Sequence, residues 1–353
     1  MTFWETVLLI VGLLIKIGVV VGILQGAVAY LILVERKIAA YAQDRIGPNR
    51  AGSEFGIPFA LLQPLVDGAK MLLKEDVIPS YVNKPLYIIA PMIAIFAATI
   101  SFAVVPFGIV GPGLPLNFQF QLAPNIDVGI VYIFAVGSLG VYAIILAGWA
   151  SNNKYAFLGG LRSSAQLISY EIPLGLSVIG MILIAGSLDL NTIINWQDRN
   201  VWGIVVQPLG FLLFVISSFA ETNRLPFDLP ESEQELVGGF HTEYSAMKFG
   251  MFFLGEYLNV ITVSFLIVIL FLGGWDVPFV TDQSQVGVFW AIFKCLVMIA
   301  KVAVMILIIM WVRWTLPRFR YDTLMELAWK SLIPLSLINL VATAAIVQLI
   351  RSS

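Results

Sequence analysis

The stretch FGMFFLGEYLNVITVSFLIVILFL, residues 249–272, is almost wholly apolar and contains one acid, Glu256. About 20 consecutive apolar residues are enough for a helix to span the hydrocarbon core of a bilayer. The run therefore predicts a membrane-spanning helix that carries a carboxyl group.

The rest of the chain has the same character, with 59% hydrophobic and 12% charged residues among 353. A typical soluble domain carries about 25% charged residues. The composition therefore predicts an all-α integral membrane protein that forms a single membrane domain over residues 1–353. Its about eight spans are expected near Thr6–Val34, Leu86–Phe107, Ile126–Trp149, Gln166–Ser187, Val201–Ala220, Phe249–Leu272, Val286–Val312 and Leu332–Ile350.

Basic residues are distributed unevenly between the loops. The loops 35–85, 150–165, 220–248 and 313–331 hold most of the 20 lysines and arginines, whereas the opposite loops and the termini hold only Arg199 and Arg351. Cytoplasmic loops of membrane proteins carry an excess of such residues. We therefore expect the first set of loops in the cytoplasm and both termini in the periplasm.

The first of these loops contains an amphipathic segment, Phe59–Glu75. Its polar residues Gln63, Asp67, Lys70 and Lys74 recur at helical spacing, and leucines fill the opposite face. Such a pattern is typical of a helix that lies in the membrane interface. A helix packed on neighbouring spans is the alternative.

Acidic residues are concentrated in the third loop and just beyond it, over residues 220–257. A solvated loop is the ordinary explanation of an acidic run. Here, however, the acids are interleaved with apolar residues such as Phe227 and Phe240, which a solvated loop does not need. The pattern favours a packed polar segment beside the membrane.

Several ionisable residues fall within the expected spans or at their ends. A charged residue at the centre of a bilayer helix costs about 2.5–3.5 kcal/mol on insertion scales, and such residues often mark a path for ions or protons. For Lys16, Lys294 and Glu171, a side chain that reaches the interface is an alternative. The candidates are Lys16, Glu171, Glu221, Glu256, Lys294 and Lys301.

The chain has one cysteine, Cys295, and one histidine, His241. A thiolate-bound iron–sulfur cluster typically needs four cysteines, and structural zinc needs about four Cys or His ligands. These counts therefore exclude an iron–sulfur cluster and a structural zinc site held by this chain alone, and we expect it to bind no metal. It also lacks the glycine-rich nucleotide-binding patterns.

Five long strings resemble one family, in the right order and across nearly the whole chain. The family is the H-type membrane subunit of respiratory complex I, which corresponds to subunit 1 of the mitochondrial NADH dehydrogenase. The strings are ERKIAAYAQDRIGPNRAG (35–52), LLQPLVDGAKMLLKE (61–75), GWASNNKYAFLGGLRSSAQLISYEIP (148–173), AETNRLPFDLPESEQELVGGFHTEYS (220–245) and WVRWTLPRFRYDTLMELAWKSLIPL (311–335).

The resemblance implies a non-redox subunit of a proton-translocating NADH:quinone oxidoreductase. It would form much of the quinone tunnel, begin a buried carboxylate path and anchor the hydrophilic arm. Quinone would be the substrate, while FMN and iron–sulfur clusters would belong to partner subunits. Its expected partners are other membrane subunits, the two hydrophilic subunits of the quinone site, quinone and lipid, without nucleic acid. Its expected location is the bacterial inner membrane.

The resemblance also assigns residues by position. Glu35 and Arg36 would lie near the tunnel, and the segment Phe59–Glu75, with Asp67 and Lys70, would border its entrance. We assign no role to His241. The charged wall under the quinone would comprise Arg224, Asp228, Glu231, Glu233 and Glu235, and the proton path would comprise Glu171, Glu221, Glu256 and Lys301.

Three other interpretations share part of this pattern. The homologous subunit of a membrane-bound hydrogenase or of a plastid-type complex is one, although the intact GPNR and AETNR strings favour complex I. A secondary ion transporter would use the buried acids, but such transporters commonly contain an inverted repeat, which this chain does not show. A passive scaffold would explain the loops but not Glu256 or Lys301.

Overall fold

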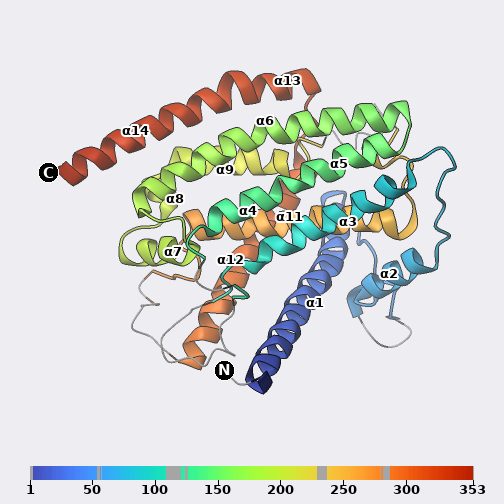
Figure 1. The fold of residues 1–353 in the computed structure, drawn as a ribbon, viewed down its shortest axis with the longest axis horizontal. Coiled ribbons are helices and arrows are strands. Elements are labelled where there is room, and N and C mark those ends of the chain that lie inside the picture. The colour runs from blue at the N-terminus through green and yellow to red at the C-terminus, as the bar shows by residue number, and fades with distance from the viewer. Residues whose placement is uncertain are drawn as a thin grey trace.

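The computed structural model describes residues 3–53, 56, 58–108, 121–123, 126–228, 237–278, 280 and 287–352, and these contain helices and no strands (Figure 1). The α-helices are α1 (Phe3–Ala42), α2 (Gln63–Leu73), α3 (Lys84–Ile100), α4 (Gly129–Gly137), α5 (Leu139–Ala150), α6 (Lys154–Ala185), α7 (Leu190–Arg199), α8 (Gly203–Val206), α9 (Pro208–Glu221), α11 (Ala246–Phe271), α12 (Val288–Thr315), α13 (Tyr321–Glu326) and α14 (Ile333–Ser352). Short 3₁₀ turns lie at Pro58–Ala60, Ser101–Ala103 and Gly239–His241, and a π-helical turn at Leu327–Leu332 joins α13 to α14.

Within the described residues, seven helices are long and apolar enough to cross a membrane. The sequence predicts about eight, and the difference lies at Val201–Ala220. There the chain breaks at Gln207, and Pro208, which has no backbone N–H, begins the 14-residue α9. At about 1.5 Å per residue, α9 is about 21 Å long, which is shorter than a bilayer core of about 30 Å.

Helices α1 and α6 extend further than the sequence predicts. Helix α1 continues through Ala42, so the residues at the start of the first polar loop are helical. Helix α6 begins at Lys154, before the expected Gln166, because the Asn153 side chain caps it by accepting a hydrogen bond from the Tyr155 N–H. Apolar runs show where a helix crosses the membrane, but they do not show how far it projects beyond it.

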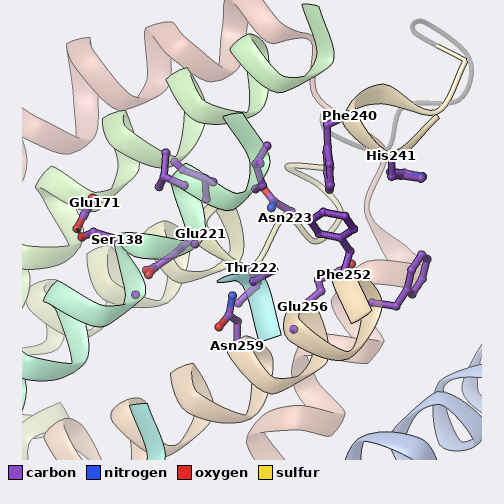
Figure 2. Close-up of a pocket in the computed structure, with 18 of the residues that line it drawn as sticks. Ser138, Glu171, Glu221, Thr222, Asn223, Phe240, His241, Phe252, Glu256 and Asn259 are labelled. Carbon is purple, nitrogen blue, oxygen red and sulfur yellow. Dashed lines mark hydrogen bonds between the residues drawn. The ribbon is translucent and has the colours of Figure 1, made fainter. Parts of the chain in front are cut away.

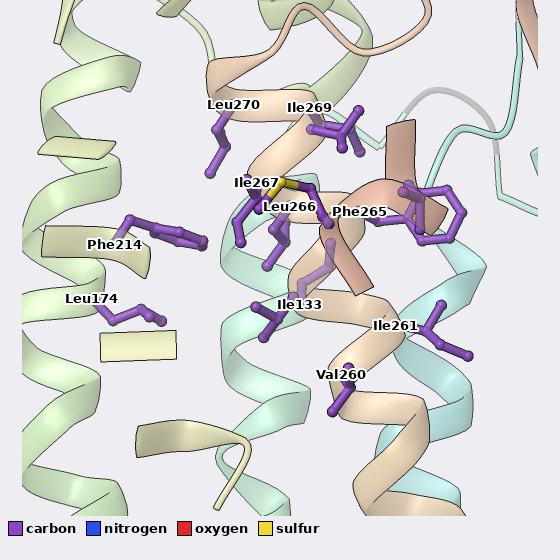
Figure 3. Close-up of a cluster of buried hydrophobic side chains, with 14 of the residues drawn as sticks. Ile133, Leu174, Phe214, Val260, Ile261, Phe265, Leu266, Ile267, Ile269 and Leu270 are labelled. Carbon is purple, nitrogen blue, oxygen red and sulfur yellow. The ribbon is translucent and has the colours of Figure 1, made fainter. Parts of the chain in front are cut away.

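Helix α11 is the centre of the fold. Residues from α4, α6 and α9 pack around it, as Figure 3 shows for Ile133, Leu174 and Phe214 beside Leu266 and Leu270. Lipid tails are as apolar as these side chains, so close packing, rather than removal from water, holds spans together. Helices α1 and α12 cross the other long helices at a steep angle, and α14 lies outside α6 (Figure 1). Surrounded in this way, α11 brings Glu256 into the interior.

Small residues bring two segments of the site close together. A Cβ atom added to Gly148 on α5 would lie 2.8 Å from the Ala156 carbonyl oxygen on α6. A Cβ added to Gly159 on α6 would lie 2.7 Å from the Cα of Gly239. The 3₁₀ turn Gly239–His241 is therefore seated directly on α6, which fixes the side chains that this turn carries.

Candidate functional site

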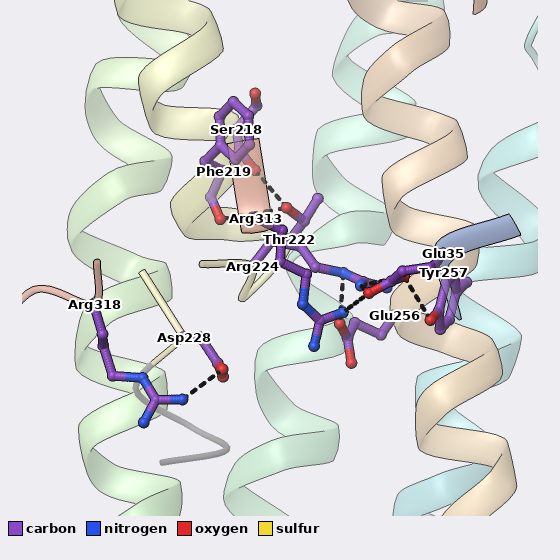
Figure 4. Close-up of polar contacts among 10 residues, drawn as sticks. All are labelled: Glu35, Ser218, Phe219, Thr222, Arg224, Asp228, Glu256, Tyr257, Arg313 and Arg318. Atoms are coloured by element: carbon purple, nitrogen blue, oxygen red, sulfur yellow. Dashed lines mark hydrogen bonds and ion pairs between the residues drawn. The ribbon is translucent and has the colours of Figure 1, made fainter. Parts of the chain in front are cut away.

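A buried ion cluster joins three helices and the segment after α9 (Figure 4). Arg224 Nη1 donates to the two carboxylate oxygens of Glu35 on α1 at 3.0 and 2.9 Å, and its Nε lies 2.8 Å from Glu256 Oε1 on α11. Arg313 on α12 also pairs with Glu35, and the Tyr257 hydroxyl donates to Glu35 at 2.7 Å. Two carboxylates and two guanidinium groups thus balance one another in the interior.

Arg224 is the hub of this cluster, and only 3% of its side chain is exposed. Its guanidinium also lies over the Tyr257 ring, 4.2 Å from the centroid. Burial lowers the pKa of Arg224, but the carboxylates of Glu256 and Glu35 raise it more, so that the net shift is upward. The group therefore stays charged, and it needs both partners.

A second ion pair lies beside the first. Asp228 is buried and accepts a hydrogen bond from Arg318 at 2.9 Å. Burial raises the pKa of Asp228 above its usual value, and Arg318 opposes that rise. Asp228 thus lies near the cluster of Arg224 (Figure 4). Glu231, Glu233 and Glu235, expected in the same charged wall, lie outside the described residues.

A large cavity of about 950 Å³ lies between α1, α2, α11 and α12, and we call it the α1–α2 cavity. Its polar lining includes Glu35, Arg36, Asp67 and Arg313, together with Arg45, Gly47 and Pro48 of the first loop. Apolar side chains, among them Met71, Leu72, Met247, Phe253 and Trp314, line the rest. A cavity of this size and mixed lining suits a small molecule with a polar head and an apolar tail.

Helix α2 forms one wall of this cavity. Arg36 donates to Asp67 at 2.7 Å, and Gln63 donates to the other Asp67 oxygen at 2.9 Å. The Arg36 side chain is half-exposed, so this pair contributes at most about 1 kcal/mol. Asp67 thus lines the α1–α2 cavity and is held there by two hydrogen bonds. Lys70 is exposed on α2 and does not line the cavity.

A second, smaller cavity of about 90 Å³ lies on another side of α11, and we call it the carboxylate cavity (Figure 2). One water needs at least about 10–15 Å³ of such space, so several waters fit. Glu171 of α6, Glu221 at the end of α9 and Glu256 of α11 all line it. The structure thus brings together three carboxyl groups that are far apart in the sequence.

Each glutamate has a distinct setting. Glu171 is hydrogen-bonded to the hydroxyl of Ser138, at the break between α4 and α5. One oxygen of Glu221 is buried and has no hydrogen-bond partner among the described residues. Glu256 pairs with Arg224. Other polar groups that line the cavity are Thr222, Asn223 and Asn259. The cavity therefore offers both carboxyl groups and neutral hydrogen-bonding groups in a small space.

Arg224 connects the linings of the two cavities through its ion pairs. Phe249 and Phe253 line both of them, which places the cavities on either side of these rings. Glu35 lines the α1–α2 cavity, Glu256 lines the carboxylate cavity, and Arg224 pairs with both. A change of charge in one cavity is therefore felt directly by an ion pair of the other.

Lys301, expected in the proton path, lines neither cavity. Its amino group donates to the carbonyl oxygens of Leu272, at 2.7 Å, and Asp276, and it lies 4.4 Å from the centroid of the Trp202 ring. These carbonyls follow the last turn of α11, where a cation is favourable. Hydropathy places this lysine inside a span but does not show the direction of its side chain.

His241, which the sequence gives no role, lines the carboxylate cavity. Its ring lies 5.2 Å from the rings of both Phe240 and Phe249. Burial lowers the pKa of His241 to about 4, so the imidazole is neutral at pH 7. Sequence spacing offers no signal for this placement, because the close approach of Gly159 to Gly239 creates it.

Fold and site together define a class: a multi-pass helical membrane protein in which a buried ion cluster separates a large amphiphilic cavity from a small acidic one. Within the described residues no three His, Cys, Asp or Glu side chains are placed to hold a metal ion. The model of the NADH dehydrogenase family matches residues 15–344, and the chain belongs to that family.

Relatives in this family match the chain over nearly their whole length. The chain is 47% identical to the NADH-quinone oxidoreductase H subunit 1 of Cytophaga hutchinsonii, over 91% of the chain and 92% of that protein. It is 48% identical to the H subunit 2 of Koribacter versatilis, over 95% and 97%, and 48% identical to the H subunit of Rhodospirillum rubrum, over 90% and 89%. The resemblance inferred from the five sequence strings is thereby confirmed.

Proposed function

We propose that this chain is the quinone-binding, proton-coupling membrane subunit of a complex I, with the α1–α2 cavity as part of the quinone tunnel. The cavity has charged residues at Glu35 and Arg313 and apolar walls at Leu72 and Phe253. A quinone has a polar ring and an apolar isoprenoid tail. The cavity offers charged side chains to the ring and apolar side chains to the tail.

The proposal that quinone reduction is coupled to proton movement rests on one observation: Arg224 pairs with a carboxylate from each cavity. Reduction of a quinone to quinol takes up two electrons and two protons, and when those protons come from groups that line the α1–α2 cavity, the charge near Glu35 changes. When Glu35 pairs less strongly, the guanidinium of Arg224 interacts more strongly with Glu256, and the reverse holds. Glu256 then exchanges protons with Glu221 and Glu171 across the waters of the carboxylate cavity, as coupled titrating groups do.

The surroundings of the site are also part of the proposal. Helix α2, with exposed Leu65, Leu72 and Leu73, lies in the membrane interface beside the tunnel entrance. The polar segments around Arg36 and Arg318 dock the hydrophilic arm, whose subunits contain the FMN and iron–sulfur clusters. The chain is one membrane domain in a bacterial inner membrane, and α8 and α9 together form the eighth crossing, which leaves both termini in the periplasm.

A photoreactive quinone analogue tests the binding half. In the intact complex we expect crosslinks on α1, α2 and the first half of α11, in peptides that contain Ala39, Met71 or Met247. Excess unlabelled quinone should abolish them. Labels confined to α14, whose residues do not line this cavity, would contradict the assignment.

A further inference from the structure

Aromatic rings crowd one end of the carboxylate cavity. His241 packs against Phe240 and Phe249, and Phe249 lies 4.6 Å from Phe253, measured between ring centroids. Phe240 also lies 5.2 Å from Phe252. We call these five lining residues the aromatic collar. Figure 2 shows Phe240, His241 and Phe252 at one end of the cavity, while Ser138 and Glu171 lie at the other.

His241 is the one ionisable member of this collar, and Glu171, Glu221 and Glu256 are the other ionisable groups among the described lining residues. The two charged residues that follow His241 in sequence, Glu243 and Lys248, have other partners. Glu243 accepts hydrogen bonds from Tyr81 at 2.7 Å and Asn153 at 2.6 Å. Lys248 pairs with Asp76. Of His241, Glu243 and Lys248, only His241 lines the cavity.

Packing holds His241 in place. Besides the contact of Gly239 with Gly159, the Tyr87 hydroxyl donates to the Glu243 carbonyl oxygen at 2.6 Å. The rings of Tyr87 and Tyr244 are stacked 4.1 Å apart. These contacts fix the backbone on either side of His241 and involve no atom of its ring, so the imidazole keeps its place at the collar when it turns.

Apolar rings around a narrow passage exclude water and interrupt a chain of hydrogen bonds. A neutral imidazole has one nitrogen that donates and one that accepts, so it can take up a proton on one side and release another on the opposite side. Burial favours this neutral form of His241, since it lowers its pKa.

We propose that His241 is the relay through which protons pass the aromatic collar into the carboxylate cavity, an inference that rests on the proposed function. Water outside the collar gives a proton to the unprotonated ring nitrogen. The other nitrogen releases its proton to a water or carboxylate inside, and rotation of the ring or a return exchange restores the starting tautomer. One proton enters and one leaves, without transfer of electrons.

Chemical rescue tests this role in the intact complex. In His241→Ala we expect proton translocation coupled to quinone reduction to fall at least about tenfold. Imidazole in the medium should restore most of it, because it supplies the missing proton carrier. Pyrrole, which has the same shape and no basic nitrogen, should not. NADH oxidation by ferricyanide measures assembly and should stay unchanged.

A second variant keeps the test decisive if His241→Ala does not assemble. His241→Phe preserves the ring and the packing, and it should lose coupled turnover while retaining the assembled complex. Rescue by pyrrole as good as by imidazole, or normal translocation in His241→Phe, would overturn the proposal. The proposed function has a separate readout, since a failed relay leaves the quinone crosslinks on α1, α2 and α11 intact.

Discussion

Glu35 and Glu256 stand in different cavities, yet both pair with the guanidinium of Arg224, at 2.9 and 2.8 Å. One residue thus connects the place where we propose that quinone binds to the place where three carboxyl groups share a small space. Substitutions at this residue and in the two cavities therefore separate binding, coupling and stability.

Arg224→Met should destabilise the complex, because it leaves two buried carboxylates without their main partner. Loss of one partner of a buried ion pair costs about 3–5 kcal/mol. The melting temperature of the purified complex and its amount in the membrane measure the effect. Arg320→Met is the matched control, since Arg320 is exposed and pairs with exposed Asp322. Equal stability of both variants would show that the buried cluster contributes little.

Gly68→Phe should narrow the α1–α2 cavity. Gly68 lines the cavity, and a Cβ added there meets nothing within 4 Å. We expect the apparent KM for quinone to rise about tenfold, in the range that a misfit in an apolar pocket produces. Ala69→Phe is the control, because the neighbouring Ala69 is exposed and does not line the cavity. An equal rise of the apparent KM in both variants would show that the quinone tunnel lies elsewhere.

Lys301→Met should lower stability but leave coupling intact. The amino group of Lys301 donates to two backbone carbonyls beyond α11, and a hydrogen bond from a charged group contributes about 1.5–3 kcal/mol. We expect a lower melting temperature with an unchanged ratio of protons pumped to electrons transferred. Lys301→Arg should recover part of the stability. A reduced ratio of protons pumped to electrons transferred, with normal stability, would instead support a place for Lys301 in the proton path.

His241 should make the complex less stable in acid. Its pKa falls from an ordinary value of about 6.5 to about 4 in the folded chain. Between these values the unfolded chain binds the extra proton, so stability is full above about pH 6.5 and declines as the pH falls toward 4. Melting temperatures at pH 7 and pH 5 should therefore differ more in the wild type than in His241→Phe. A larger difference in the variant would be inconsistent with a buried neutral imidazole.

Much of the fold follows from the sequence because the bilayer imposes a simple length rule. The apolar runs predict α11 and α12 closely, whereas the run 201–220 forms two shorter helices, α8 and α9, divided at Gln207 and Pro208, instead of one continuous helix. Helix ends outside the bilayer, such as the start of α6, depend on capping by Asn153 rather than on hydropathy.

For the site, the sequence singles out candidate residues but does not show where their side chains lie. Charge in an apolar span singles out Glu171 and Glu256, and the structure places both on one cavity. The same argument singles out Lys301, which instead caps α11, because hydropathy gives depth without direction. The place of His241 could not be predicted, because it depends on the contact between two glycines that are 80 residues apart, Gly159 and Gly239.

Infrared difference spectroscopy of the complex during quinone reduction tests most directly whether charge in one cavity reaches the other. We predict a carboxyl C=O band that changes on reduction, disappears in Glu256→Gln and persists in Glu326→Gln, since Glu326 is exposed and pairs with exposed Lys330. An identical band in wild type and Glu256→Gln, with normal quinone reduction and pumping, would contradict coupling through Arg224.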